Sequence, residues 1–220
     1  MWRASAQPED ILAELNPAQR EAVTHAEGPL LVLAGAGSGK TRVIAHRIAY
    51  LLGVQGVNPR NLLAVTFTNK AAEEMRRRVE GLLLPGGIRP PLISTFHSAC
   101  VRILRERIDH LGFSRSFIIY DEHDRLAVVR ECLRELEVDE RVLSPSSVVR
   151  RISHAKNQMV SVEEMERRAG TPRDERIALV LRRYQDRLTR AGALDFDDLL
   201  LLTVRLFEKT PEILAWYRGL

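Results

Sequence analysis

Short apolar runs alternate with amphipathic stretches over the first half of the chain. Three of the runs have the length and composition of strands: 28–34, 61–67 and 91–95. Each is followed by a stretch with helical periodicity: 40–52, 69–83 and 98–111. Apolar strands that alternate with helices favour a parallel sheet covered on both faces. We therefore predict an α/β fold in which the sheet lies between two helical layers.

The pattern changes near Gly112. From there to Gly192 it is helical almost throughout, with apolar residues at helical spacing in two stretches: Leu126, Val129, Leu133 and Leu136, then Ile177, Leu181, Tyr184 and Leu188. Further helices are predicted over 194–210 and from 211 onwards. We predict that residues 1–111 form the first part of the α/β domain, that 112–192 form an inserted helical subdomain, and that 193–220 return to the α/β domain.

The composition is ordinary for a globular protein, with 45% hydrophobic and 28% charged residues among 220. The longest apolar runs are too short to span a bilayer, and the polar N-terminal stretch has no secretory apolar region, so we expect a cytoplasmic protein without membrane contact. Cys100 and Cys132 suggest neither a disulfide framework nor a metal cluster. We expect both to act as small buried apolar residues.

Basic residues give the chain a formal net charge of +4, and arginine far outnumbers lysine among them. Arginine pairs with phosphate through two hydrogen bonds and stacks on bases, which fits a nucleic-acid partner. A solvated surface on which arginine replaces lysine explains the same composition, so charge alone leaves both interpretations open. Two of the four lysines, Lys40 and Lys70, fall inside motifs that carry more specific chemistry.

The stretch VLAGAGSGKTRV at 32–43 follows one predicted strand and opens a predicted helix. It matches the phosphate-binding loop pattern at Gly39, Lys40 and Thr41, with Ala34 where the pattern has its first glycine. In such a loop, backbone N–H groups and the positive end of the helix hold phosphate oxygens. Lys40 would reach the β- and γ-phosphates, and Thr41 would offer its hydroxyl to Mg²⁺. We predict a nucleoside triphosphate site; a glycine turn without ligand is the alternative.

Polar and aromatic residues gather where two predicted strands end. The sequence there reads Thr66, Phe67, Thr68, Asn69 and Lys70 at one strand end, and Thr95, Phe96 and His97 at the next. The carboxyl ends of parallel strands form the edge at which open α/β sheets bind ligands. Aromatic rings beside hydroxyls and a cation suit single-stranded nucleic acid, whose bases stack on such rings. The alternative is that the two phenylalanines are core residues that cap the sheet.

Five segments together resemble one family. They are LNPAQREAV at 15–23, AGAGSGKTRV at 34–43, AVTFTNKAAEEM at 64–75, STFHSACVRIL at 94–104 and LDFDDLLLLTVRLF at 194–207. In this order and at this spacing they resemble the N-terminal part of the UvrD/Rep/PcrA-type DNA helicases of superfamily 1. The resemblance covers nearly all of the chain and implies an incomplete RecA-like P-loop domain with an inserted all-helical subdomain. Ala34 fits it, because this family commonly has alanine there.

The resemblance also implies roles for single residues. Gln19 would read the adenine edge, which favours ATP over GTP, and Arg42 would lie against the adenine ring. ATP and Mg²⁺ would be held by Ala34, Gly35, Ala36, Gly37, Ser38, Gly39, Lys40 and Thr41, with Lys40 and Thr41 in the catalytic contacts and Thr41 on the metal. Single-stranded DNA would be contacted by Thr66, Phe67, Asn69, Lys70, Thr95, Phe96 and His97.

Hydrolysis of ATP also needs an aspartate that holds Mg²⁺ and a glutamate that activates water, at the end of another strand. The candidates are Asp121-Glu122 and the acidic group of Asp195, Asp197 and Asp198. We interpret Asp121 as part of a helix start, where a negative charge meets the helix dipole. The second group lacks a preceding strand in the predicted pattern. We therefore assign catalysis to neither.

In the family, the strand with the Asp-Glu pair follows a segment like PEILAWYRGL, at which this sequence stops. We expect the N-terminal fragment of a helicase, which binds ATP with Mg²⁺ and single-stranded DNA but neither hydrolyses nor unwinds. The implied parent moves 3′ to 5′ on single strands, opens duplex junctions in DNA repair or replication, and has a second RecA-like domain as partner. The alternatives are a regulatory nucleotide-binding module without turnover, and a P-loop kinase of a small metabolite.

Overall fold

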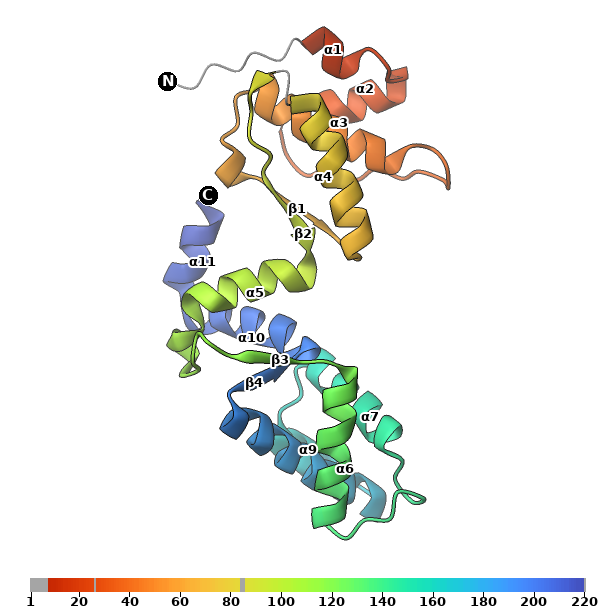
Figure 1. Ribbon diagram of the computed structural model, residues 1–220, viewed down its shortest axis with the longest axis vertical. Coiled ribbons are helices and arrows are strands. Elements are labelled where there is room, and N and C mark those ends of the chain that lie inside the picture. The colour runs from red at the N-terminus through yellow and green to blue at the C-terminus, as the bar shows by residue number, and fades with distance from the viewer. Residues whose placement is uncertain (1–7, 26, 84–85, 220) are drawn as a thin grey trace. The chain divides into compact units, whose positions relative to one another are not determined.

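The computed structural model describes residues 8–25, 27–83 and 86–219 (Figure 1). It divides into two compact units, one that ends at Phe96 and one that extends from His97 to Gly219. The division of the chain into an α/β domain and a helical subdomain inserted at 112–192 stays a prediction.

The first unit combines helices with a short parallel sheet. Its elements are α1 (Pro8–Leu12), α2 (Pro17–Thr24), α3 (Lys40–Gly53), the 3₁₀ turn η1 (Pro59–Asn61), β1 (Leu63–Thr66), α4 (Asn69–Leu83) and β2 (Leu92–Thr95). β1 and β2 pair in parallel, with Leu63 opposite Leu92 and Thr66 opposite Thr95. The predicted helix at 69–83 is confirmed residue for residue, and the two predicted strands are confirmed in shorter form.

The core of the first unit lies where α3 and α4 pack beside the sheet (Figure 1). In α4 the buried positions Ala72, Met75, Val79 and Leu83 recur at helical spacing, which makes one face of this charged helix apolar. The buried cluster consists of Ile11, Ala45, Ile48, Ala49, Leu52, Ala64, Met75, Val79, Leu83, Ile88 and Ile93. This cluster fixes the ends of β1 and β2 relative to α4.

The predicted strand at 28–34 is wrong for this structure. Residues 29–35 have no regular secondary structure, and the side chains of Leu31 and Leu33 are 82% and 86% exposed. A strand is stabilised by hydrogen bonds to neighbouring strands, and in the described part of this unit β1 and β2 pair only with each other. The apolar run therefore has the composition of a strand but pairs with neither β1 nor β2.

The second unit is mostly helical. Its elements are α5 (Phe96–Arg107, whose first residue belongs to the first unit), the 3₁₀ turn η3 (Ile108–Leu111), β3 (Ile118–Tyr120), α6 (Glu122–Glu135), α7 (Pro145–Asn157), α8 (Val162–Arg168), α9 (Pro172–Ala191), β4 (Ala193–Asp195), α10 (Phe196–Lys209) and α11 (Pro211–Arg218). Pro145 and Pro172 occupy first turns, where their missing N–H groups cost nothing.

Two three-residue strands form a small parallel sheet in this unit. β3 and β4 pair in parallel, with Ile118 opposite Ala193 and Tyr120 opposite Asp195. The expectation that no strand precedes the acidic segment at 195–198 is therefore wrong, because Ala193, Leu194 and Asp195 form β4. The run is too short for its pattern to signal a strand, and its partner is distant in sequence.

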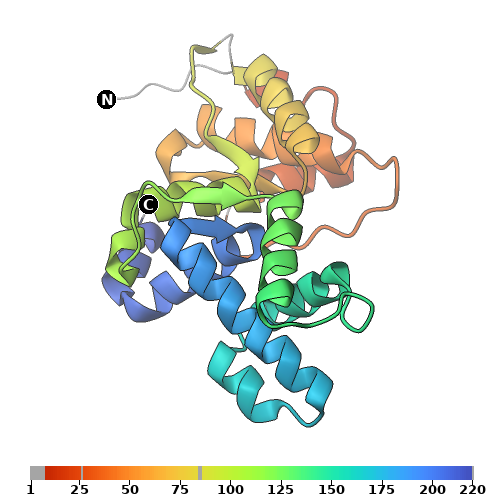
Figure 2. The same ribbon diagram turned by 60° about the horizontal axis from the view of Figure 1, so that its bottom comes forward.

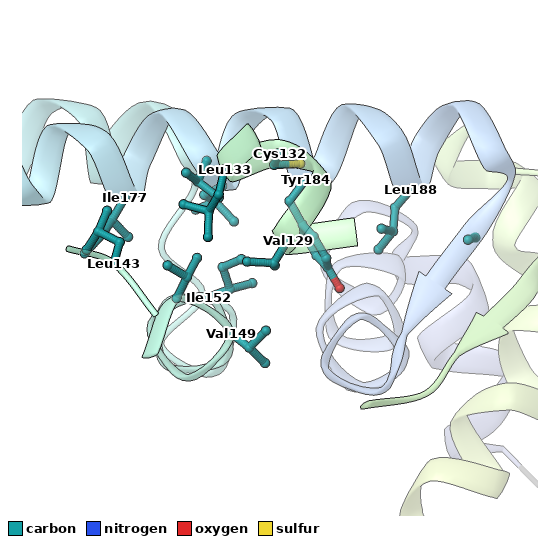
Figure 3. Close-up of a cluster of buried hydrophobic side chains, with 13 residues drawn as sticks. Val129, Cys132, Leu133, Leu143, Val149, Ile152, Ile177, Tyr184 and Leu188 are labelled. Atoms are coloured by element: carbon teal, nitrogen blue, oxygen red, sulfur yellow. The ribbon is translucent and has the colours of Figure 1, made fainter. Parts of the chain in front are cut away.

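The helices α6, α7 and α9 lie side by side around one apolar core (Figures 1 and 2). Figure 3 shows side chains of this cluster, among them Val129, Leu133, Ile152 and Tyr184. Cys132 is fully buried in the cluster, and burial raises the pKa of its thiol to about 11, as expected for an unreactive small apolar residue. Cys100 is only half-buried.

Among the described residues, no helix is long and apolar enough to cross a membrane.

Candidate nucleotide and DNA site

The glycine-rich loop leads directly into the first turn of α3. Gly37 and Gly39 have φ angles of 75° and 85°, in the left-handed region that favours glycine. Gly39 is the N-cap of α3 and makes no side-chain cap to its first N–H groups. A 14-residue helix therefore presents its positive end and its uncapped N–H groups to the loop. This is the arrangement that binds phosphate oxygens.

The ammonium of Lys40 is held against the same loop. Its Nζ donates to the carbonyl oxygens of Gly35 at 2.6 Å and Ala34 at 3.1 Å. The Ser38 hydroxyl also donates to Gly35 O, at 2.8 Å. Thr41 is half-buried in the first turn of α3. The loop thus places one cation and one hydroxyl at the end of the helix, where a triphosphate and Mg²⁺ need them.

Gln19 is fixed in one orientation by a capping box at the start of α2. Its backbone N–H donates to Asn16 Oδ1 at 2.9 Å, and its side-chain oxygen accepts from the Asn16 N–H at 3.1 Å. The other end of the amide, Nε2, donates to Ser38 O at 3.1 Å. Arg47 holds the far end of α2 to α3 by donating to Ala22 O at 2.9 Å and His25 O at 2.8 Å. The structure therefore places Gln19 in contact with the phosphate loop.

Arg42 lies one residue beyond Thr41 and forms an ion pair with Glu14. The side chains of Arg42 and Glu14 are 38% and 76% exposed, so the pair is open to solvent and weak. Nothing in the sequence pattern pointed to Glu14. Its contact holds the Arg42 side chain against the turn between α1 and α2.

The two strand ends meet, because Thr66 and Thr95 are paired in register across β1 and β2. Both threonines are buried, and the Thr66 hydroxyl donates to Thr68 O at 3.0 Å. The Thr68 hydroxyl in turn accepts from the Ala71 N–H at 3.2 Å, in the first turn of α4. These hydroxyls shape the turn between strand and helix.

The phenylalanines that follow the threonines project outward. Phe67 is 91% exposed and Phe96 is 43% exposed, and their ring centroids are 5.6 Å apart with the planes tilted by 42°. The interpretation of Phe67 as a core residue is therefore wrong. Asn69 and Lys70 lie exposed in the first turn of α4, and Lys70 has no ion-pair partner among the residues that the structure describes. Two rings, an amide and a cation thus share one edge of the first unit.

His97 begins the second unit and contacts an aromatic residue for which the sequence pattern predicted no role. The ring of Phe196 packs edge-on against His97, with centroids 5.6 Å apart and planes at 73°. Phe196 is 44% exposed although it stands between Asp195 and Asp197 in the chain. The aspartates around Phe196 drew attention to a metal site and away from the ring. An aromatic residue between aspartates at the start of a helix was the sequence signal that could have identified it.

The sequence from residue 15 to residue 219 matches the family described as UvrD/REP helicase N-terminal domain. The chain belongs to the UvrD/Rep helicase family. This match confirms the predicted family, and the parallel α/β fold with helical additions agrees with it.

Three bacterial relatives of this UvrD/Rep chain are informative. It is 49% identical over 208 residues to the ATP-dependent DNA helicase PcrA of Bacillus subtilis strain 168, which is 94% of this chain and 28% of that protein. It is 46% and 45% identical over 211 residues to the PcrA helicases of Staphylococcus epidermidis strain RP62A and Staphylococcus aureus strain Mu50. Each alignment covers 95% of this chain and 28% of the relative. The chain thus spans little more than a quarter of the length of these relatives.

The acidic segments of this UvrD/Rep chain are already engaged in structural contacts. Asp121 is the N-cap of α6 and accepts from the Asp124 N–H at 2.9 Å, and this bond lowers the pKa of Asp121. Asp195 and Asp198 are buried, and both pair with Lys156, at 2.7 Å and 2.8 Å. Asp121, Asp195 and Asp198 are therefore each engaged in a contact within the described chain.

Proposed function

We propose that this chain is the N-terminal ATP- and DNA-binding part of an ATP-dependent DNA helicase. The observation that supports it most is the loop at the start of α3, where an uncapped helix end, Lys40 and the immobilised amide of Gln19 meet. The relatives that share up to 49% of its residues are named ATP-dependent DNA helicases.

ATP with Mg²⁺ fits the residues of this loop. Lys40 would exchange the Gly35 carbonyl for the β- and γ-phosphates, and the N–H groups at the start of α3 would donate to phosphate oxygens. Thr41 would offer its hydroxyl to the metal, Gln19 would read the adenine edge, and Arg42 would lie on the adenine face. When bound, ATP supplies the phosphoanhydride whose cleavage powers the complete enzyme.

Single-stranded DNA fits the edge formed by Phe67 and Phe96. A base stacks on an exposed aromatic ring with about 1–3 kcal/mol, whatever its identity. Lys70 then neutralises a nearby phosphate, and Asn69 donates from its amide. Thr66 and Thr95 act by shaping the turns, because their side chains are buried. In the second unit, His97 and Phe196 offer a second aromatic contact.

We infer that this part of the helicase holds ATP without turning it over. The inference is supported by the engagement of Asp121 in a helix cap and of Asp195 and Asp198 with Lys156. The complete protein, with a second RecA-like domain, is proposed to hydrolyse ATP, to move 3′ to 5′ along single-stranded DNA and to open duplex junctions. The same engagement of the carboxylates speaks against a metabolite kinase.

The test is nucleotide binding and phosphate release by the chain 1–220, with and without an oligothymidylate, beside Lys40→Ala. Lys209→Ala is the matched control, because Lys209 is an exposed lysine in the last turn of α10. We expect Lys40→Ala to weaken binding of a fluorescent ATP analogue by about 10-fold or more, since a charge-assisted hydrogen bond contributes roughly 1.5–3 kcal/mol. Lys209→Ala should bind normally, and no variant should release phosphate.

Equal affinity of the wild-type chain and Lys40→Ala would refute the loop assignment. Phosphate release that is stimulated by DNA and lost in Lys40→Ala would instead refute the absence of turnover. ATP binding without any DNA binding would favour a regulatory nucleotide-binding module over a helicase part.

A further inference from the structure

A cluster of charged side chains is buried in the second unit around the segment 195–198. Lys156 Nζ lies 2.7 Å from Asp195 Oδ2 and 2.8 Å from Asp198 Oδ1, and these three side chains are 5%, 0% and 2% exposed. The Tyr184 hydroxyl also donates to Asp195 Oδ2, at 2.8 Å. Figure 3 shows the ring of Tyr184 extending from α9 with this hydroxyl at the edge of the apolar core.

Asp197 is bound by a second set of donors. Arg125 Nη2 and Ser153 Oγ donate to the same oxygen, Asp197 Oδ2, at 2.8 Å and 2.6 Å. Arg125 Nη2 also donates to Ser153 Oγ at 2.7 Å, so the three groups form a closed triangle. Arg125 is 7% exposed and Asp197 is 16% exposed, which places this triangle largely out of water. It joins α6 and α7 to the first turn of α10.

Burial and neighbouring charges shift the pKa values of Asp195 and Asp198 in opposite directions. Burial acts to raise the pKa of Asp195, but Lys156 and Arg125 outweigh it and hold that pKa below its ordinary value. Burial raises the pKa of Asp198, against the opposing effect of Lys156. Asp195 therefore stays ionised at neutral pH and remains a firm acceptor for Lys156 and Tyr184.

Phe196 lies between the two anchored carboxylates. The backbone around it is closed by a capping box, in which the Asp198 N–H donates to Asp195 Oδ1 at 2.9 Å and the Asp195 N–H donates to Asp198 Oδ2 at 3.2 Å. The ring itself is 44% exposed and touches His97, so apolar burial alone does not fix it. The capping box and the bound carboxylate of Asp197 hold the backbone on either side of the ring.

We propose that Arg125 and Ser153 are positioning residues that hold Phe196, through Asp197, in the direction in which its ring receives a base of single-stranded DNA. The proposal rests on the proposed function, because it assumes that this edge of the second unit binds single strands. It gives the helical part a role beyond its own packing. α6 and α7 fix an aromatic contact at the start of α10.

Asp197→Asn is the informative variant, because it keeps the shape of the side chain and weakens the triangle. Removal of a negative charge would by itself strengthen binding to DNA. A loss of affinity is therefore the signature of a positioning role. Asp174→Asn is the matched control, since Asp174 pairs with Arg151 at 2.8 Å on the surface of the same unit and undergoes the same charge change.

Binding of a fluorescein-labelled oligothymidylate to the chain 1–220 is measured by anisotropy for five proteins: wild type, Asp197→Asn, Asp174→Asn, Phe196→Ala and the Asp197→Asn/Phe196→Ala double variant. We expect Phe196→Ala to weaken binding by about 5-fold or more. Asp197→Asn should weaken it by about 3- to 10-fold, and this loss should vanish when Phe196 is already alanine. Asp174→Asn should bind at least as tightly as the wild type.

An NMR readout reports the ring directly. Because Phe196 packs edge-on against His97, its ring current shifts the imidazole proton signals of His97, and Asp197→Asn and Ser153→Ala should move these signals while Asp174→Asn leaves them in place. Additive effects of Asp197→Asn and Phe196→Ala on DNA binding, or unmoved His97 signals in a folded Asp197→Asn chain, would overturn the proposal. Absence of DNA binding by the wild type would instead overturn the proposed function, and the proposal with it.

Discussion

Replacement of Phe67 by alanine separates a ring that binds DNA from a ring that supports the fold. Removal of a buried phenylalanine costs about 3–5 kcal/mol of stability. Phe67 is 91% exposed, and its contact with Phe96, at 5.6 Å between centroids, lies at the surface. Since it has almost no buried area to lose, we expect the free energy of unfolding to change by less than about 0.5 kcal/mol.

The effect on DNA binding should be far larger. A base that stacks on an aromatic ring contributes about 1–3 kcal/mol, so Phe67→Ala should raise the dissociation constant for an oligothymidylate by about 5- to 150-fold. Anisotropy titration at fixed salt measures this constant, and urea denaturation measures stability in the same buffer. Leu63→Ala is the control, because Leu63 is an apolar residue, 55% exposed, at the opposite end of β1.

Two outcomes would refute this reasoning. A drop of several kcal/mol in stability would mean that Phe67 is packed in solution, and any loss of DNA binding would then follow from unfolding. Unchanged stability with unchanged DNA affinity would mean that the exposed ring has no stacking role. Equal losses in Phe67→Ala and Leu63→Ala would remove the strand end from the binding surface.

Two further substitutions test the loop and the buried cluster. Gly39→Ala should lower the free energy of unfolding by about 1–2 kcal/mol and weaken ATP binding, because φ is 85° and the added Cβ would lie 3.1 Å from Gln19 Nε2. The control, Gly81→Ala within α4, should not destabilise the chain. Equal midpoints of urea denaturation for the two variants would contradict the strain at Gly39. Lys156→Met should lower stability by about 3–5 kcal/mol, because it leaves two buried aspartates without their cation; a loss below about 1 kcal/mol in urea denaturation would show that the pairs matter little.

Local signals in the sequence were sufficient for most helices and for the strand ends. The apolar spacing in α4 predicted its bounds. The capping box of Asn16 and Gln19, which the structure shows at the start of α2, is an equally local feature. The match of Thr66 with Thr95 followed from the rule that parallel strands end at one edge. In each case the cause of the structure lies within a few residues of the pattern that reveals it.

The segment at 28–34 shows where local signals fail. Its apolar run has the composition of a strand that is covered on both faces, and such a strand depends on neighbours to which it can donate and accept hydrogen bonds. Within the described part of the first unit, β1 and β2 form strand hydrogen bonds only with each other. The composition of the segment predicted its preference for a strand, and the absence of pairing with β1 or β2 left it without regular secondary structure.

The acidic segment at 195–198 shows the same dependence for chemistry. Three aspartates at the end of a short strand resemble a metal site when only residue types are considered, and the sequence pattern left that role unassigned. Lys156, Arg125, Ser153 and Tyr184, which supply its donors, lie 11 to 72 positions away in the chain. Because a buried carboxylate that already accepts hydrogen bonds from a lysine or an arginine has little capacity left for Mg²⁺, its neighbours within 3 Å decide its role. The same neighbours turn this segment into an anchor for Phe196.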